Sequence, residues 1–189
     1  MKTLSALSAR ARVLTAAAAV GAGIVGVVSV TAGTSTASAA PAPAPAAGAS
    51  VAGKDLVRPS RLSVDAATRA AQAALAAARK DGQKVSVAVV DRDGNTVVTL
   101  RGDGAGPQSY ESAQRKAYTA VSWNAPTSAL VKRLEQAPNL KDIPGTLFLP
   151  GGTPVQADGQ PVAGIGVAGA PSGDQDEKFA QAGAAALGR

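Results

Sequence analysis

Two valine-rich segments joined by a turn signal constrain the fold most strongly. Residues 84–90 and 96–101 flank Asp91-Arg92-Asp93-Gly94-Asn95, where Gly94 can adopt the positive φ that a tight turn requires. The turn also begins like a calcium-binding loop. An EF-hand, however, needs Glu at the twelfth position, which is Gly102 here. We therefore predict a β-hairpin, in which neighbouring strands pair antiparallel.

The rest of the chain predicts three more strands and four helices. Ser63 and Ser109 are expected to cap the first two helices, and Asp174 with Glu177 to form a capping box at the start of the last one. The resulting order, α-β-β-α-α-β-β-β-α, predicts a single α+β domain with an antiparallel five-stranded sheet and about four helices. The helices are expected at 63–80, 109–123, 127–136 and from 174 onwards, and the further strands at 147–149, 155–157 and 162–168.

The N-terminal 55 residues differ from the rest in composition. Lys2, Arg10 and Arg12 precede an apolar stretch that ends in the small-residue pattern Ala37-Ser38-Ala39, which is typical of a cleaved secretory signal peptide. The competing interpretation is an uncleaved membrane anchor, since the apolar run is near spanning length. We expect residues 1–39 to be a cleaved signal, 40–55 a Pro/Ala-rich disordered linker and 56–189 the folded domain. The protein would then be secreted and remain extracellular or associated with the cell wall.

Three residue types are missing from the expected domain, and their absence limits its chemistry. The chain has no Cys and no His, and its single Met is Met1. This excludes a disulfide framework, a Ser-His-Asp triad and metal sites built on Cys or His. Removing the three basic residues of the signal lowers the count from 19 to 16, against 13 acidic residues. These basic residues are scattered, so we do not expect a nucleic-acid partner.

Three short patterns have both a functional and a structural interpretation. Gly164-Ile165-Gly166-Val167-Ala168-Gly169 matches a dinucleotide-binding fingerprint, but its glycines alternate within a predicted strand. We expect them to allow close approach of a helix or a flat ligand. Ser112 and Lys116 could form a Ser–Lys pair, although a solvated helix face explains their spacing better. The acidic residues Asp174, Asp176 and Glu177 could bind a cation, but a helix start accounts for them.

The second predicted helix has the richest set of candidate binding residues. Tyr110, Tyr118 and Trp123 are three of the five aromatic residues of the chain. Ser112 and Thr119 share a helical stripe with Trp123, and Arg115 and Lys116 lie near it. Aromatic, hydroxyl and cationic groups together suit a flat, amphipathic, anionic ligand. An ordinary core helix with a polar rim would explain the same pattern.

Four segments in order resemble the GlcG/HbpS family, whose members are described as haem-degrading. They are residues 85–95, the helix around Arg115-Lys116-Ala117, Gly151-Gly152-Thr153-Pro154-Val155 and Gly164–Gly169, and the resemblance extends over residues 62–187. With the export signal, it is strongest to the secreted haem-binding branch. The resemblance implies an antiparallel sheet covered by helices, assembly into an octamer, haem binding with slow haem breakdown, and release of iron. It also implies a membrane sensor histidine kinase as partner, whose response to haem and oxidative stress the protein modulates.

The resemblance also indicates where haem would bind. It implies a site on the helix 109–123, with Thr119, Tyr110 and Tyr118 as candidate oxygen ligands of the haem iron and Arg115 and Lys116 as partners of the propionates. Of the usual axial ligands, only tyrosine remains in the expected mature chain. The resemblance also implies surface carboxylate pairs for iron, but none is evident on the first predicted helix, where Ala76 and Arg79 stand. The alternative is a GlcG-type small-molecule-binding or oxidoreductase-associated subunit. For the haem-binding protein, slow haem degradation is the most enzyme activity that we expect, because the sequence offers no catalytic triad or nucleotide site.

Overall fold

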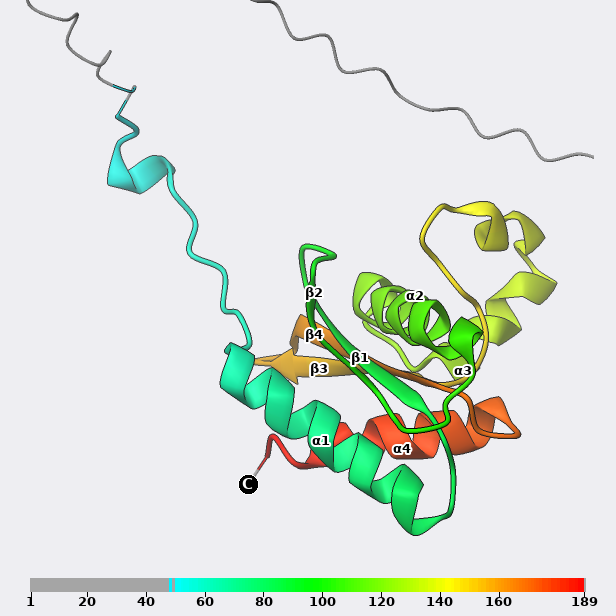
Figure 1. Ribbon diagram of the computed structural model, residues 1–189. Coiled ribbons are helices and arrows are strands. Elements are labelled where there is room, and N and C mark those ends of the chain that lie inside the picture. The colour runs from blue at the N-terminus through cyan, green and yellow to red at the C-terminus, as the bar shows by residue number, and fades with distance from the viewer. Residues whose placement is uncertain (1–47, 49, 189) are drawn as a thin grey trace, which may run out of the picture. The chain divides into compact units, whose positions relative to one another are not determined.

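The computed structural model describes Gly48 and residues 50–188, so the predicted signal segment and most of the predicted linker lie outside the described part (Figure 1). Within it, no helix is long and apolar enough to cross a membrane. The α+β class is confirmed. The helices are α1 (Val64–Lys80), α2 (Pro107–Trp123), α3 (Thr127–Val131) and α4 (Gly173–Ala185), and the strands are β1 (Ser86–Asp91), β2 (Thr96–Arg101), β3 (Gly152–Ala157) and β4 (Gln160–Ala168).

The described strands form one antiparallel sheet in the order β2-β1-β4-β3. It has four strands, so the predicted fifth strand at 147–149 is wrong. The backbone N–H of Leu147 donates to Thr119 Oγ1 on α2 at 2.8 Å. The rings of Phe148 and Trp123 pack edge to face, with their centroids 5.2 Å apart. These contacts hold the segment against α2 instead of the sheet.

The predicted N-cap is confirmed for the first helix and is wrong for the second. The first helix begins as predicted, because Ser63 Oγ accepts a hydrogen bond from the N–H of Ala66. The second begins at Pro107, with Gly106 at the N-cap position, so Ser109 is not the cap. The Ser109 side chain is buried instead: its hydroxyl donates to Gly106 O at 2.6 Å and shares a hydrogen bond with Ser86 Oγ at 2.8 Å.

The predicted capping box and the length of the third helix are also wrong. The N-cap of α4 is Ser172, whose Oγ accepts from Gln175 N, and the carboxylate of Glu177 points towards α3. There it accepts from Ser128 N at 2.9 Å and from Ser128 Oγ at 2.5 Å, satisfying free donors at the first turn of α3. The α-helix at 127 ends at Val131 and continues as a 3₁₀ helix, Lys132–Glu135.

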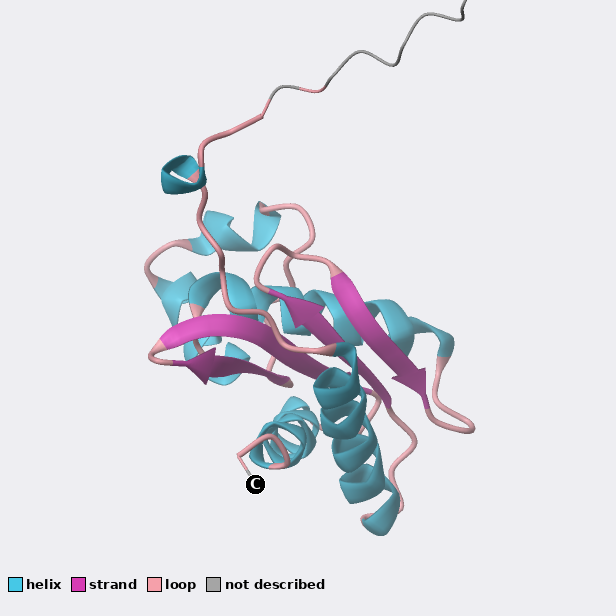
Figure 2. Cartoon of the chain, turned by 90° about the vertical axis from the view of Figure 1, so that its left-hand side faces the viewer, coloured by secondary structure: helices cyan, strands magenta, loops and turns pink. Residues whose placement is uncertain are grey.

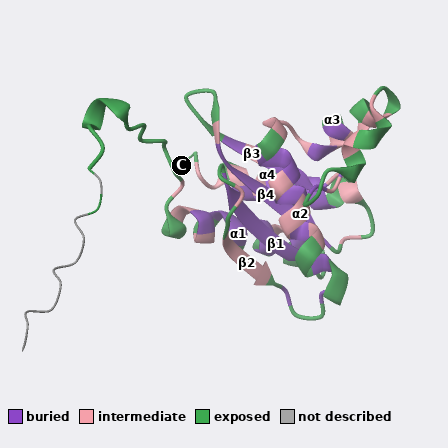
Figure 3. Ribbon diagram, turned by 90° about the horizontal axis from the view of Figure 1, so that it is seen from above, coloured by how far each residue is buried: buried purple, intermediate pink, exposed green. Residues whose placement is uncertain are grey.

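The helices cover both faces of the sheet, giving three layers. Figures 1 and 2 show α1 and α4 on one face and α2 on the other. Val87 and Val89 of β1, with Ile165 and Val167 of β4, pack into the main core on the α1/α4 side. In Figure 3 the central strands are buried, whereas β2 at the border of the sheet is only partly so.

The glycines of β4 allow α2 to lie unusually close to the sheet. A Cβ added to Gly166 would collide with the backbone of Ala113 and Ala117, and one added to Gly164 would collide with the carbonyl of Ala117. This confirms the prediction that the alternating glycines make room for a neighbouring element. The element is α2, and the glycines lie within a strand instead of the turn that a dinucleotide fingerprint requires.

Candidate functional site

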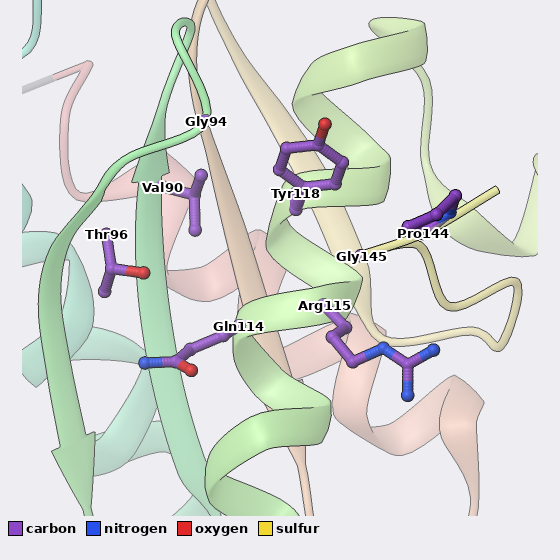
Figure 4. Close-up of a pocket in the computed structure, with 8 residues that line it drawn as sticks. All are labelled: Val90, Gly94, Thr96, Gln114, Arg115, Tyr118, Pro144 and Gly145. Atoms are coloured by element: carbon purple, nitrogen blue, oxygen red, sulfur yellow. The ribbon is translucent and has the colours of Figure 1, made fainter.

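A pocket of about 440 Å³ lies between the β1–β2 hairpin and α2. Figure 4 shows its lining side chains, which come from the sheet floor, the exposed flank of α2 and the loop before β3. None of the eight lining residues is acidic, and the cation among them is Arg115. The lining residues are Val90, Gly94, Thr96, Gln114, Arg115, Tyr118, Pro144 and Gly145.

The hairpin turn forms one wall of the pocket, and Asp91 organises it. Asp91 Oδ1 accepts from the N–H groups of Asp93 at 2.9 Å and Asn95 at 2.8 Å, and Arg61 pairs with Oδ2 at 3.4 Å. Burial opposes ionisation of this carboxyl, but the hydrogen bonds from Asn95 and Asp93 and the charge of Arg61 together lower its pKa. The carboxylate therefore acts as the acceptor of a turn, which supports the hairpin interpretation over a calcium loop.

Tyr118 stands between two glycines at the centre of the pocket. Gly94 has a φ of 87°, and a Cβ there would lie 2.9 Å from Tyr118 Cε2. On the opposite edge of the ring, Gly145 has a φ of 79°, and its Cβ would lie 3.6 Å from Cε1. Both positions favour glycine because L side chains rarely adopt such φ values. The phenol ring is thereby held between the hairpin and the loop.

Two side chains of α2 fasten this loop to the helix. Arg115 Nη2 donates to Thr146 O at 2.7 Å, and the hydroxyl of Thr119 accepts from Leu147 N at 2.8 Å. Arg115 is also 3.8 Å from the carboxylate of Glu111, an exposed contact one helical turn away. Since a guanidinium has five N–H donors, Arg115 can hold the loop and still offer donors to an anion at the rim.

The pocket combines apolar walls with a few polar groups. Val90, the Tyr118 ring and Pro144 supply the apolar surface. Gln114 Nε2 donates to Thr99 Oγ1 on β2 at 3.3 Å, which fixes the amide across the groove between α2 and the sheet edge. Such a pocket can hold a flat, largely apolar ligand and direct an anionic substituent towards Arg115.

The structure separates the seven predicted site residues instead of gathering them. Arg115 and Tyr118 line the pocket. Tyr110 is exposed at the first turn of α2, Ser112 is half-buried, and Trp123 packs on Phe148 at the other end of the helix. Thr119 is fully buried; its hydroxyl donates to Arg115 O at 2.7 Å and accepts from Leu147 N, so both of its roles are already used.

Lys116 lies on the buried face of α2, which corrects the prediction of a solvated face. Its Nζ donates to Asp176 Oδ2 at 2.8 Å and to Val167 O at 3.2 Å, and the two side chains are only 6% and 4% exposed. Burial raises the pKa of the Asp176 carboxyl, outweighing the opposing effect of Lys116 and of the N–H of Ala170. This ion pair joins α2, β4 and α4, and neither of its residues lines the pocket.

Two of the three acidic residues at the start of α4, Asp176 and Glu177, are likewise engaged inside the protein, whereas Asp174 is exposed. Asp176 pairs with Lys116, and Glu177 accepts hydrogen bonds from Ser128, Thr127 and the N–H of Gly151. Within the described residues, no group of three acidic side chains is arranged to hold a metal ion. Their contacts explain their burial without a cation.

Most of the pocket could not be found from the sequence. Val90, Thr96, Gln114 and Pro144 are ordinary apolar or neutral residues, and only the folded chain brings them beside Tyr118. The available signal was the glycine of the hairpin turn, because a turn that needs positive φ also leaves space beside it for a ring.

Comparisons with known proteins agree with one another. Residues 62–185 match the family model described as "Haem degrading protein HbpS-like". A double mutant of Streptomyces reticuli HbpS is 71% identical over 78% of this chain and 100% of that chain, with a TM-score of 0.75. A further crystal structure of HbpS is 72% identical, covering 75% and 100%, with a TM-score of 0.74. The PduOC:haem complex is 29% identical, covering 67% and 95%, with a TM-score of 0.62. A search of curated proteins gave no match.

Proposed function

The chain belongs to the HbpS-like family of haem-degrading proteins, and from this premise we propose that it binds haem in the pocket between α2 and the β1–β2 hairpin. The observation that carries the proposal is the position of Tyr118 and Arg115 in one apolar-walled pocket (Figure 4). The structure of a relative, PduOC, in complex with haem supports the choice of ligand.

The residues present fit a haem in three respects. Val90, Pro144 and the Tyr118 ring offer apolar surface to a macrocycle. The chain has no His or Cys, and among the residues that line the pocket Tyr118 is of a type that commonly ligates haem iron. Arg115 provides a guanidinium for a propionate. When bound, haem would supply iron redox chemistry that these side chains do not have.

Each side chain has a separate role in this proposal. Tyr118 would offer its phenol oxygen to the iron, and Arg115 would hold a carboxylate of the ligand while it keeps the loop at Thr146 in place. Gln114 and Thr96 limit the pocket on the side of β2. Thr119 and Lys116 are not part of the proposed site, because their polar groups already form hydrogen bonds with Leu147 and Asp176.

We further propose that the protein acts outside the cell. Its N-terminal sequence has the pattern of a secretory signal. From the resemblance described above, we also propose that it assembles into an octamer and modulates a membrane sensor histidine kinase in response to haem and oxidative stress. Slow breakdown of bound haem would release iron. Secretion is tested by locating the protein with and without residues 1–39, and an intracellular full-length protein would contradict it. The kinase role is tested by autophosphorylation of the kinase with haem-loaded and haem-free protein, and equal phosphorylation would contradict it.

A haemin titration tests the site. We expect a saturable Soret change for the purified protein, a shifted spectrum for Tyr118→Phe, and weaker binding for Arg115→Gln. Tyr110→Phe is the matched control, because it removes the same hydroxyl from the same helix at an exposed position outside the pocket.

The outcomes separate the ligand from its position. Absence of any saturable Soret change would exclude haem and favour the GlcG-type alternative, for which a metabolite that raises the melting temperature is the positive sign. A Soret change that Tyr110→Phe alters and Tyr118→Phe does not would keep haem as the ligand but place it elsewhere on α2.

A further inference from the structure

The segment that precedes α1 contacts the domain through few side chains. Residues 56–61 are exposed, and Leu62, the next residue, packs against the main core. Among the residues that the structure describes, the polar contacts that join residues 57–61 to the domain all belong to Arg61. Arg61 therefore fixes where this segment meets the domain.

The Arg61 guanidinium lies between two carboxylates of the β1–β2 turn. Its Nη1 is 3.4 Å from Asp91 Oδ2, and its Nη2 is 2.5 Å from Asp93 Oδ2. The two carboxylates carry like charges on one tight turn, so a cation between them offsets their repulsion. Asp91 also accepts the N–H groups of Asp93 and Asn95. The shape of the turn thus depends on Asp91, and Arg61 joins Asp91 to Asp93.

The same turn carries one wall of the pocket. Gly94 directly follows Asp93, and its N–H donates to Asp91 O at 3.0 Å. A Cβ on Gly94 would lie 2.9 Å from Tyr118 Cε2, so the backbone of the turn packs against the edge of the ring (Figure 4). A change in the turn therefore changes the space beside Tyr118. Arg61 itself does not line the pocket, so it can reach a ligand only through the turn.

We propose that Arg61 is a positioning residue of the pocket: it holds the turn against Tyr118 and couples haem binding to the attachment of the segment before α1. The inference rests on the haem site proposed above. The coupling is reciprocal, because a ligand that needs the wall in this position also favours the contacts of Arg61. Conversely, a partner that draws the segment away from the domain would loosen the wall and weaken haem binding.

Haemin titrations of charge variants test the positioning role. Arg61→Gln should weaken haemin binding about three- to tenfold, as expected for a contact that acts through neighbouring residues. Arg58→Gln is the matched control and should leave the affinity unchanged. It removes the same charge three residues earlier, from an exposed side chain that forms no ion pair among the described residues.

Asp93→Asn separates positioning from a general attraction of the anionic ligand. It removes a negative charge outside the pocket, so long-range attraction alone would make haemin bind more tightly. Loss of a partner of Arg61 should instead weaken binding, by about twofold for a partly exposed pair. Arg61→Lys should recover most of the affinity, because an ammonium still neutralises the two carboxylates. At saturating haemin, the Soret maximum of Arg61→Gln should shift towards that of Tyr118→Phe.

Limited trypsin digestion tests the coupling on the unsubstituted protein and needs no variant. Trypsin can cleave after Arg61 and after Lys54, but not after Arg58, which Pro59 follows. Saturating haemin should slow the initial cleavage after Arg61 by about the factor that Arg61→Gln loses in affinity, because the two effects belong to one thermodynamic cycle. Cleavage after Lys54 is the internal control and should keep its rate. Mass spectrometry of the new N-termini distinguishes the two cuts.

The outcomes distinguish this proposal from the haem site on which it rests. Absence of any saturable Soret change in the unsubstituted protein would refute the haem site, and the positioning role with it. Saturable binding that Arg61→Gln and Arg58→Gln change equally, or that Asp93→Asn strengthens, would overturn the positioning role alone. Equal protection of both trypsin sites by haemin would overturn the coupling. Thermal unfolding checks that Arg61→Gln is folded, as expected for the loss of exposed ion pairs.

Discussion

Removing the ammonium of the buried Lys116–Asp176 pair should leave an uncompensated carboxylate inside the protein. The two charged atoms are 2.8 Å apart, and both side chains are almost fully buried. Breaking such a pair by removing one partner costs about 3–5 kcal/mol, because the remaining charge has lost both water and its counter-ion. We therefore expect Lys116→Met to lower the free energy of unfolding at neutral pH by about that amount, measured by urea denaturation.

The chain offers a matched control for this substitution. Lys178 Nζ is 3.0 Å from Asp81 Oδ2, a similar separation, but the two side chains are 71% and 41% exposed. Exposed pairs contribute about 0–1 kcal/mol, so Lys178→Met should have a correspondingly small effect. The two variants differ in burial and not in the group removed. Equal losses of stability would refute the argument that burial makes the Lys116 pair important.

The stability of Lys116→Met should also depend on pH in a direction that follows from the pKa of Asp176. Burial already raises the pKa of Asp176, and loss of Lys116 should raise it further. A carboxyl whose pKa is higher in the folded state binds its proton more tightly there, so the variant should gain stability as pH falls towards the ordinary Asp value and lose it as pH rises. The slope is at most about 1.4 kcal/mol per pH unit.

A double variant isolates the charge from the packing. Lys116→Met combined with Asp176→Asn keeps an acceptor for the N–H of Ala170 while removing the buried charge. It should be more stable than Lys116→Met alone at neutral pH and should lose the added pH dependence. A double variant that is less stable than the single one would mean that hydrogen bonding, and not the unpaired charge, determines the cost.

Three further substitutions test other parts of the structure. Gly166→Ala should destabilise the protein by about 1–3 kcal/mol or more in urea, because its Cβ meets the backbone of α2, whereas Gly188→Ala, with open space around it, should change stability by less than about 0.5 kcal/mol. Asp91→Asn should reduce the loss of stability that the protein shows as the pH falls below the ordinary pKa of Asp. A carboxyl with a lowered pKa stabilises the fold above that pH and loses this contribution as the pH falls. The same loss of stability at acid pH in both proteins would count against the role of Asp91 in the turn. Thr119→Val should accelerate hydrogen exchange at the N–H of Leu147 by removing its acceptor; unchanged exchange there would show that the loop is held by other contacts.

The sequence predicted those parts of the fold that depend on local chemistry. The hairpin at Asp91–Asn95 was predictable because the turn and its Asx hydrogen bonds lie within five residues. The segment 147–149 looks like a strand by composition, but its fate depends on Thr119, 28 residues away in sequence. A short apolar run does not reveal whether a sheet or a helix will satisfy its backbone.

The candidate site was predictable to a similar extent and for the same reason. Helical spacing identified α2 and, with it, Arg115 and Tyr118, but it could not tell which face of the helix would meet the sheet. Lys116 next to Arg115 turned out to face the core, because its partner Asp176 comes from a helix 60 residues further on. Neighbours in sequence therefore ended in different environments, a buried ion pair and an open pocket.

The position of the pocket follows from a gradient of residue size across one face of the sheet. Beneath α2, β4 presents Gly164 and Gly166, which bring the helix into backbone contact. Towards the hairpin the floor becomes Val90 and then Thr96 at the sheet edge, where Cβ atoms and branched side chains keep the helix further from the strands. Tyr118 enters the resulting gap without filling it. A close contact over β4 and a pocket over the end of β1 and β2 are thus two results of the same packing. We infer that enlarging Gly166 should disturb the pocket from the opposite side of α2, without any change to a residue that lines it.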